Sequence, residues 1–237
     1  MNSTELFIKT HPVKLFLLAS LPGAASMFAS ALYYTLDGIF VGHFLGETAF
    51  AALNLSMPFV IINFSLADLI GVGSAIPISI SLGKKQKAEA DNLFTCACIM
   101  IIAAGVLIGA ALFASAPLLI RLMGAEGDFA DLAVQYLRVY ALCSPVTTII
   151  FAVDNFLRIC GYIRGSLFVN LLMSVLSAVL EFVFLGIFHW GIWAAALATC
   201  SGMCICSVVA FLPFFKGKAS LRFCRPHLTP GLIRQII

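Results

Sequence analysis

Charged residues are scarce in this sequence. Lysine, arginine, aspartate and glutamate together make up 11% of the 237 residues, against roughly 25% in an ordinary soluble domain. Hydrophobic residues make up 62%, and the mean hydropathy is +1.06. This composition excludes a soluble globular domain and gives no reason to expect a nucleic-acid site. It is typical of an integral membrane protein.

Motifs of conventional enzymes are also missing. No nucleophile elbow, Walker loop, HExxH helix or Rossmann glycine pattern occurs in the sequence. Eight cysteines lie almost entirely within apolar segments, where they behave as small hydrophobic residues. The pairs at 96 and 98 and at 204 and 206 lack the two-residue gap typical of zinc or redox pairs. We therefore expect no enzyme, no cofactor and no metal site.

Long apolar runs fill most of the chain instead. Six of them are long enough to cross a hydrocarbon core of roughly 30 Å as helices. They cover about residues 15–40, 49–82, 93–120, 132–160, 166–188 and 191–215. The joins between them are short, and the first run lacks a small-residue cleavage site, so we expect a retained helix there. The sequence predicts an all-α integral membrane protein with a six-transmembrane-helix bundle over residues 1–215 and a basic segment over 216–237.

Lysine and arginine are distributed unevenly between the predicted loops. Six spans place both termini on one side of the membrane. Twelve lysines and arginines fall on that side, and only Arg121 and Arg138 fall on the other. Because short cytoplasmic loops are enriched in these residues, we predict a multi-pass protein of the cell membrane with both termini in the cytoplasm. The basic loops then act as topology signals, with contact to anionic lipid as a weaker alternative.

Helix-breaking residues lie inside the first two spans. Pro22 is in the first, and the second contains Pro58, Gly71, Gly73 and Pro77. Helix breaks at membrane depth are tolerated where other helices or a cavity satisfy the freed backbone groups, as in transporters. Membrane helices also carry proline and glycine commonly. We expect breaks in both spans, with Pro22 as the point at which the first helix bends.

Four acidic residues stand within the apolar spans, at Asp37, Asp68, Asp154 and Glu181. An ionisable side chain near the bilayer centre costs at least about 2.5 to 3.5 kcal/mol, so each needs a partner, a cavity or a role. Asp37 and Glu181 each have a polar side chain one helical turn earlier, on the same face. With an amide from the fourth span and a hydroxyl from the sixth, the candidate pocket comprises Tyr33, Asp37, Asn155, Ser177, Glu181 and Thr199.

Such a pocket would have the chemistry of cation coupling. Two carboxylates in a low-dielectric site repel, so at least one is expected to hold a proton near neutrality unless a cation takes the proton's place. The alternative is that Asp37 marks the outer end of a short first helix and that Glu181 reaches out to the interface. The residues alone leave both interpretations open.

Four stretches resemble, in order and spacing, the amino-terminal half of the multidrug and toxic compound extrusion (MATE) transporters. They are YYTLDGIFVGHFLGETAFAALNLSMPF, GVGSAIPISISLGKKQKAEA, FLRICGYIRGSLFVN and VLEFVFLGIFHWGIWAAALAT, and together they cover nearly the whole chain. The resemblance implies one lobe of a twelve-helix transporter whose two six-helix bundles enclose a cavity that opens alternately to the two sides. It also implies export of organic cations and other lipophilic drugs, coupled to inward movement of protons or sodium ions.

The resemblance also implies site residues. By this likeness the coupling site maps onto Tyr33, Asp37, Asn155, Glu181 and Thr199. The sequence departs from the family pattern at two positions: Glu181 stands where aspartate is usual, and Ser177 stands where asparagine is common. These departures leave the choice between proton and sodium open.

Two further possibilities follow from the length and from the residue types. The final stretch, TPGLIRQII, resembles the lead-in to a seventh helix, so we expect either a piece that lacks the second lobe or two copies that associate. A lipid or polysaccharide flippase of the same superfamily is an alternative, although such cavities tend to be lined with arginines, and here only Arg138 lies inside a span. A non-transporting membrane scaffold is another.

Overall fold

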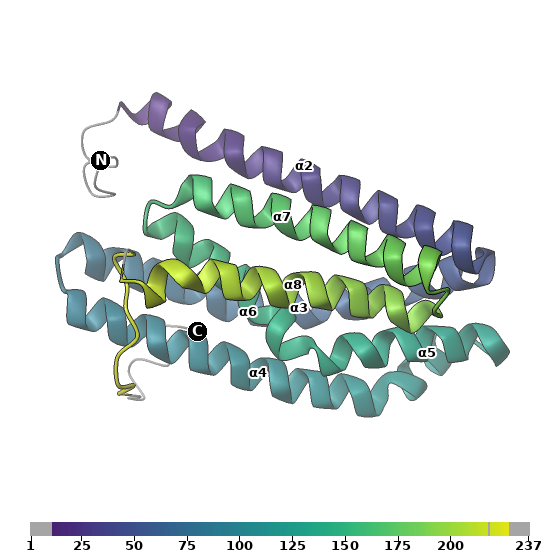
Figure 1. Ribbon diagram of the computed structural model, residues 1–237. Coiled ribbons are helices and arrows are strands. Elements are labelled where there is room, and N and C mark those ends of the chain that lie inside the picture. The colour runs from purple at the N-terminus through teal and green to yellow at the C-terminus, as the bar shows by residue number, and fades with distance from the viewer. Residues whose placement is uncertain (1–10, 218, 228–237) are drawn as a thin grey trace.

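The computed structural model describes residues 11–217 and 219–227. The helices in chain order are α2 (Pro12–Leu45), α3 (Glu47–Gly83), α4 (Lys87–Leu122), α5 (Gly127–Leu142), α6 (Ser144–Ile159), α7 (Ile163–Phe182) and α8 (Ile192–Phe215), with a π-helical segment, η1 (Val183–Ile187), directly after α7. The described residues contain no strand. The helices lie along one long axis, and the start of α2 and the end of α8 lie at the same end of the bundle (Figure 1).

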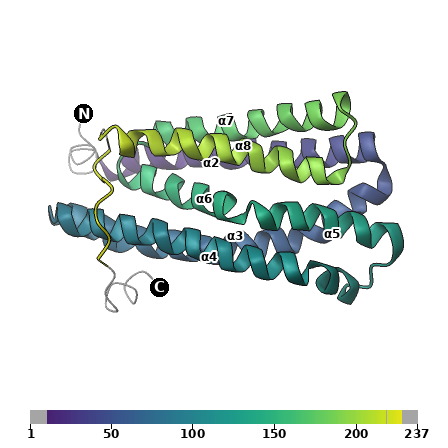
Figure 2. The same cartoon turned by 60° about the horizontal axis from the view of Figure 1, so that its bottom comes forward.

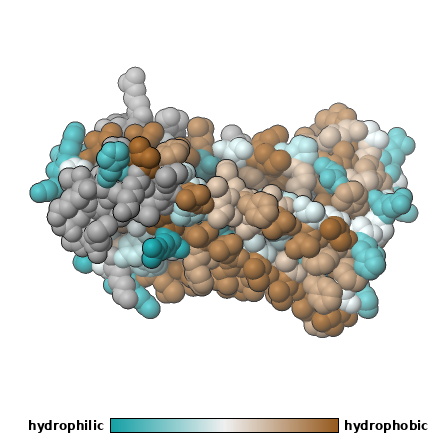
Figure 3. All heavy atoms as spheres, turned by 90° about the horizontal axis from the view of Figure 1, so that it is seen from above, coloured by the Kyte–Doolittle hydropathy of each residue, from teal (hydrophilic) through white to brown (hydrophobic). Residues whose placement is uncertain are grey.

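The predicted all-α membrane bundle is confirmed. Five helices are long and apolar enough to cross a membrane, and the bent pair α5 and α6 makes a sixth span when taken together. Each predicted span coincides with one of these within a few residues. Hydrophobic residues cover the middle of the face shown in Figure 3, and hydrophilic residues gather towards its two ends. This distribution suits a protein surrounded by lipid along its middle.

The fourth predicted span is not one continuous helix, so the single run over 132–160 is wrong in this respect. α5 and α6 meet at Cys143 and are bent by 59°. Pro145 stands in the first turn of α6. Proline has no backbone N–H and its ring clashes with the preceding turn, so it does not continue the hydrogen-bond ladder back to the carbonyl of Ala141.

Two glycines of α4 pack against the bend between α5 and α6. A Cβ atom built on Gly109 would lie 2.5 Å from the carbonyl oxygen of Ala141, and one on Gly105 would lie 2.9 Å from Cα of Pro145. Small residues four positions apart allow the backbones of membrane helices to approach closely. The α5–α6 bend is therefore packed directly onto the backbone of α4.

The prolines in the first two spans do not interrupt their helices. α2 continues through Pro22, and α3 continues through Pro58 and Pro77 and through the glycines between them. The expectation of helix breaks in these spans is wrong, because each proline removes a single N–H while the hydrogen bonds on either side persist. Bending of α2 at Pro22 stays a prediction.

The helices that position the site are α2, α7 and α8. α2 packs along α7, and α7 packs along α8, as Figures 1 and 2 both show. After α8 the chain returns along the start of α4, where the N–H of Arg222 donates to Asp91 at 2.8 Å and the N–H of His227 donates to Asn92 at 2.8 Å. The rest of the predicted segment 216–237, including its resemblance to a seventh helix, lies outside the described residues.

Candidate functional site

Asp37 of α2 and Glu181 of α7 meet where these two helices pack together. Asp37 is 2% exposed and Glu181 is fully buried. Their carboxyl groups are close enough to interact electrostatically. Among the described residues, neither oxygen of Glu181 nor Oδ1 of Asp37 has a hydrogen-bond partner. Two negative charges would repel strongly at so buried a site, and a proton or a cation bound there would offset the repulsion.

A hydroxyl bridge ties α2 to α8 beside the carboxyl pair. Tyr33, one turn before Asp37, has its phenol oxygen 2.5 Å from Oγ1 of Thr199. The Thr199 hydroxyl donates to the carbonyl of Ala195 at 3.2 Å. Tyr33 is therefore the donor to Thr199, since the single proton of the threonine hydroxyl is already used.

Ser177 lies one turn before Glu181 and is almost completely buried. Its Oγ occupies the space that a side chain at Gly202 of α8 would need. α8 therefore approaches α7 as closely as a glycine permits. The structure thus groups five of the six predicted residues at the meeting point of three helices: Tyr33, Asp37, Ser177, Glu181 and Thr199.

Asn155 lies in a different place. Its amide Nδ2 donates to Oδ1 of Asp68 at 3.2 Å, which links α6 to α3. The interactions found in the described part of the chain include none between Asn155 and either Asp37 or Glu181. A role for Asn155 in cation coupling therefore stays a prediction.

Asp154, next to Asn155, is the centre of a second polar cluster. Its Oδ2 lies 2.7 Å from Nη2 of Arg158 in an ion pair. Its Oδ1 accepts hydrogen bonds from the hydroxyl of Ser166 and from the amide of Asn170, the latter at 2.9 Å. Ser166 also accepts a hydrogen bond from Nε of Arg158 at 3.0 Å. This carboxylate, unlike the pair above, has a built-in counter-ion.

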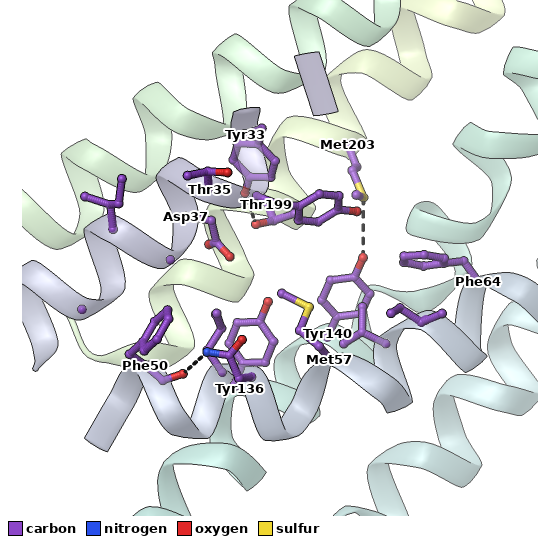
Figure 4. Close-up of a pocket in the computed structure, with 18 of the residues that line it drawn as sticks. Tyr33, Thr35, Asp37, Phe50, Met57, Phe64, Tyr136, Tyr140, Thr199 and Met203 are labelled. Atoms are coloured by element: carbon purple, nitrogen blue, oxygen red, sulfur yellow. Dashed lines mark hydrogen bonds between the residues drawn. The ribbon is translucent and has the colours of Figure 1, made fainter. Parts of the chain in front are cut away.

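A cavity of about 720 Å³ opens beside the carboxyl pair. α2, α3, α5 and α8 contribute its walls, and Asp37 is part of the lining whereas Glu181 lies behind it. Most of the lining is aromatic or apolar. The side chains labelled in Figure 4 are Tyr33, Thr35, Asp37, Phe50, Met57, Phe64, Tyr136, Tyr140, Thr199 and Met203. This volume is within the range of pockets that hold drug-sized ligands.

Sequence reasoning missed the tyrosines of this wall. Tyr136 and Tyr140 of α5 are each 2% exposed and line the cavity. The hydroxyl of Tyr140 donates to Sδ of Met203 at 3.9 Å (Figure 4). Their spacing of four residues within a predicted span places both on one helix face, and that spacing would have identified them. The residues of α3 that line the cavity show no comparable spacing that would have identified them from the sequence.

The fold and the site together define a class of protein. A bundle of membrane-crossing helices that holds a buried carboxyl pair at the edge of a drug-sized cavity has the architecture of a transporter lobe. The family model MatE matches residues 22–183. The chain belongs to the MatE family, and it is a multi-pass membrane protein.

Curated relatives and solved structures agree with this family. The multidrug export protein MepA of Staphylococcus aureus is 26% identical over 213 residues, which cover 90% of this chain and 47% of that protein. MepA of Staphylococcus saprophyticus is 26% identical over 226 residues, which cover 93% of this chain and 50% of that protein. The chain thus spans about half the length of the relatives that it matches.

The same proportion holds for the solved structures. A crystal structure of MATE in the bent conformation matches with a TM-score of 0.90 and 27% identity, over 100% of this chain and 53% of that chain. An outward-facing multidrug resistance MATE family transporter of the MOP superfamily matches with a TM-score of 0.85 and 25% identity, over 100% of this chain and 51% of that chain.

Proposed function

We propose that this chain is the amino-terminal lobe of a cation-coupled antiporter that exports organic cations and other lipophilic drugs. The observation that carries the proposal is the buried pair of Asp37 and Glu181, which has no counter-ion among the described residues and opens onto the cavity through Asp37. Uptake of a proton or sodium ion removes the repulsion between the two carboxylates. Release restores the repulsion and favours a different packing of α2 against α7.

Each grouped residue has a role in this proposal. Asp37 and Glu181 take up and release the coupling ion, and Ser177 offers a neutral oxygen beside Glu181. The bridge from Tyr33 to Thr199 holds α2 against α8 next to the pair. Asn155 belongs to the proposed set through the family resemblance alone, because its partner is Asp68.

Pro22 is proposed as the bending point of α2. The helix lacks one backbone hydrogen bond there, so the turn costs less to deform than its neighbours. Ser26 donates to the carbonyl of Pro22 at 3.0 Å, which adds a side-chain bond on the same turn. A change in the occupancy of the carboxyl pair, about four turns further along α2, would then alter the angle of the helix.

The cavity supports cations as the substrate class. Aromatic faces attract organic cations, methionine adapts to varied shapes, and Asp37 supplies a negative charge. The lining contains neither arginine nor lysine in the described part of the chain, which speaks against the anionic headgroups that a flippase would carry. From the excess of lysine and arginine on one side we also infer that both termini are cytoplasmic.

Drug efflux from cells tests this function. In cells that express the transporter containing this chain, Asp37→Asn should abolish export of a fluorescent lipophilic cation while the protein remains in the membrane. Asp131→Asn is the matched control, because Asp131 is exposed and lies outside the cavity. Export that persists in Asp37→Asn would refute the assignment. A non-transporting scaffold would show, in addition, neither proton release nor stabilisation by sodium after purification.

A further inference from the structure

Polar residues recur at matched positions on α2 and α7. On α2 they are Ser26, Ser30, Tyr33 and Asp37. On α7 they are Asn170, Ser174, Ser177 and Glu181. Both sets follow intervals of four, three and four residues, which keep the side chains on one face of a helix. Each set extends over about 16 Å at 1.5 Å per residue. We call these eight residues the polar seam.

The two halves of the polar seam lie on helices that pack along each other. α2 and α7 start at the same end of the bundle and lie side by side (Figure 1). At one end Asp37 lies close enough to Glu181 for their carboxyl groups to interact electrostatically. At the other end Nη1 of Arg158 lies 3.9 Å from the position that a Cβ atom on Gly23 of α2 would take. The Asp154 cluster, which includes Asn170, therefore closes the seam at the end where α2 begins.

The serines of the polar seam are placed to accept hydrogen bonds. Ser26, Ser30 and Ser174 each donate to the carbonyl four residues earlier, at 3.0 to 3.1 Å. Their hydroxyl protons are therefore already donated, whereas the lone pairs of their oxygens can still accept hydrogen bonds. Neighbouring positions on one helix are about 5 to 6 Å apart, whereas a hydrogen bond between oxygens spans about 2.8 Å. A relay along the seam therefore needs bridging water between the two helices.

We propose that the polar seam conducts the coupling proton from the Asp37–Glu181 pair to Asp154, which passes it to water at the end of the bundle where α2 begins. The inference rests on the proposed function. The proton leaves the carboxyl pair, protonates the Asp154 carboxylate and breaks its ion pair with Arg158. Loss of that proton to water restores the ion pair. Asp154 is 14% exposed and Arg158 is 43% exposed, so the cluster reaches the surface.

The surroundings of Asp154 suit a transient acceptor. Arg158 on the same helix and Asp68 on α3 are the charged groups that face it in the described structure. α7 presents the neutral side chains of Ser166 and Asn170, and α2 presents Gly23. The ion pair with Arg158 re-forms once the proton has passed to water, so the proposed stay of the proton at Asp154 is brief. The ion pair thereby prevents a standing leak along the seam.

Infrared spectroscopy of the full chain in lipid nanodiscs can follow the proton. The carboxylic acid band that disappears in Glu181→Gln reports the pair, and its decay after a rapid rise in pH gives the rate of proton release. Asp154→Asn should slow this rate about a hundredfold, the lower end of what a positioned proton-transfer group contributes, and Asp154→Glu should restore it. Ser174→Ala should slow it less, and Ser174→Thr should restore it.

Ser115→Ala is the matched control for the serine variant. Ser115 is a half-buried residue of α4 that also donates to the carbonyl four residues earlier, but it lies outside the seam. Its replacement should leave the rate unchanged. If no band is lost in Glu181→Gln, the pair holds no proton and the seam is overturned, whereas the proposed function fails only if export persists in Asp37→Asn. If the band is present but its decay is unchanged in Asp154→Asn, or if Asp154→Glu does not restore it, the seam is overturned while the coupling site stands.

Discussion

The two acidic clusters of this bundle differ in how their charges are neutralised. Asp154 has Arg158 at 2.7 Å and also accepts hydrogen bonds from α7. Asp37 and Glu181 are more deeply buried and have no counter-ion among the described residues. An arginine at this distance balances the charge of a carboxylate within the fold, whereas the buried carboxyl pair has no such internal counter-ion among the described residues. The first arrangement links α6 to α7, and the second is the one that the proposed cation coupling requires.

The largest expected effect concerns the close packing of α7 against α8 beside the carboxyl pair. Gly202→Val should destabilise the bundle by about 3 kcal/mol, the upper end of the cost of overpacking, because the new side chain would occupy the space of Ser177 Oγ. Equilibrium unfolding in mixed micelles measures this loss. Gly83→Val is the control, since Gly83 ends α3 with no atom near its Cβ position. Equal stability of both variants would show that α8 does not depend on this close approach.

The second effect concerns the built-in counter-ion. Arg158→Leu should cost about 1 to 2 kcal/mol, less than for a fully buried pair, because Arg158 is 43% exposed. Adding Asp154→Asn to the same protein should recover part of the loss, since no charge is then left alone. A double-mutant cycle by the same unfolding measurement gives the coupling energy. A coupling energy near zero would mean that the ion pair contributes nothing to the fold.

The sequence was sufficient to predict the six spans and most of the candidate site. The lengths of the apolar runs determine the number of crossings, and the polar residues one turn before Asp37 and Glu181 marked their shared face. The sequence was not sufficient to predict the bend at Cys143. Pro145 bends the chain while Pro22 leaves α2 continuous, and the difference depends on neighbouring helices, such as the glycines of α4 that receive the bend.

The position of Asn155 was beyond the same reasoning. Helical spacing shows which residues of one helix share a face, but it does not show which neighbouring helix that face meets. Asn155 faces α3 and finds an acceptor in Asp68. The difference between the two acidic clusters is partly visible in the sequence, because Arg158 stands one turn after Asp154. The fold adds the hydrogen bonds that Ser166 and Asn170 of α7 donate to Asp154.

The smallest expected effect separates the two clusters most sharply. Glu181→Gln should change the free energy of unfolding by no more than about 0.5 kcal/mol, because the amide has nearly the shape of the protonated carboxyl group and removes no ion pair. Asp154→Asn, measured beside it, should cost more, because it removes the partner of Arg158. A large loss in Glu181→Gln would mean that the charge of Glu181 stabilises the fold through a fixed partner. The two clusters would then be of one kind, and the case for an exchangeable ion at Asp37 and Glu181 would be lost.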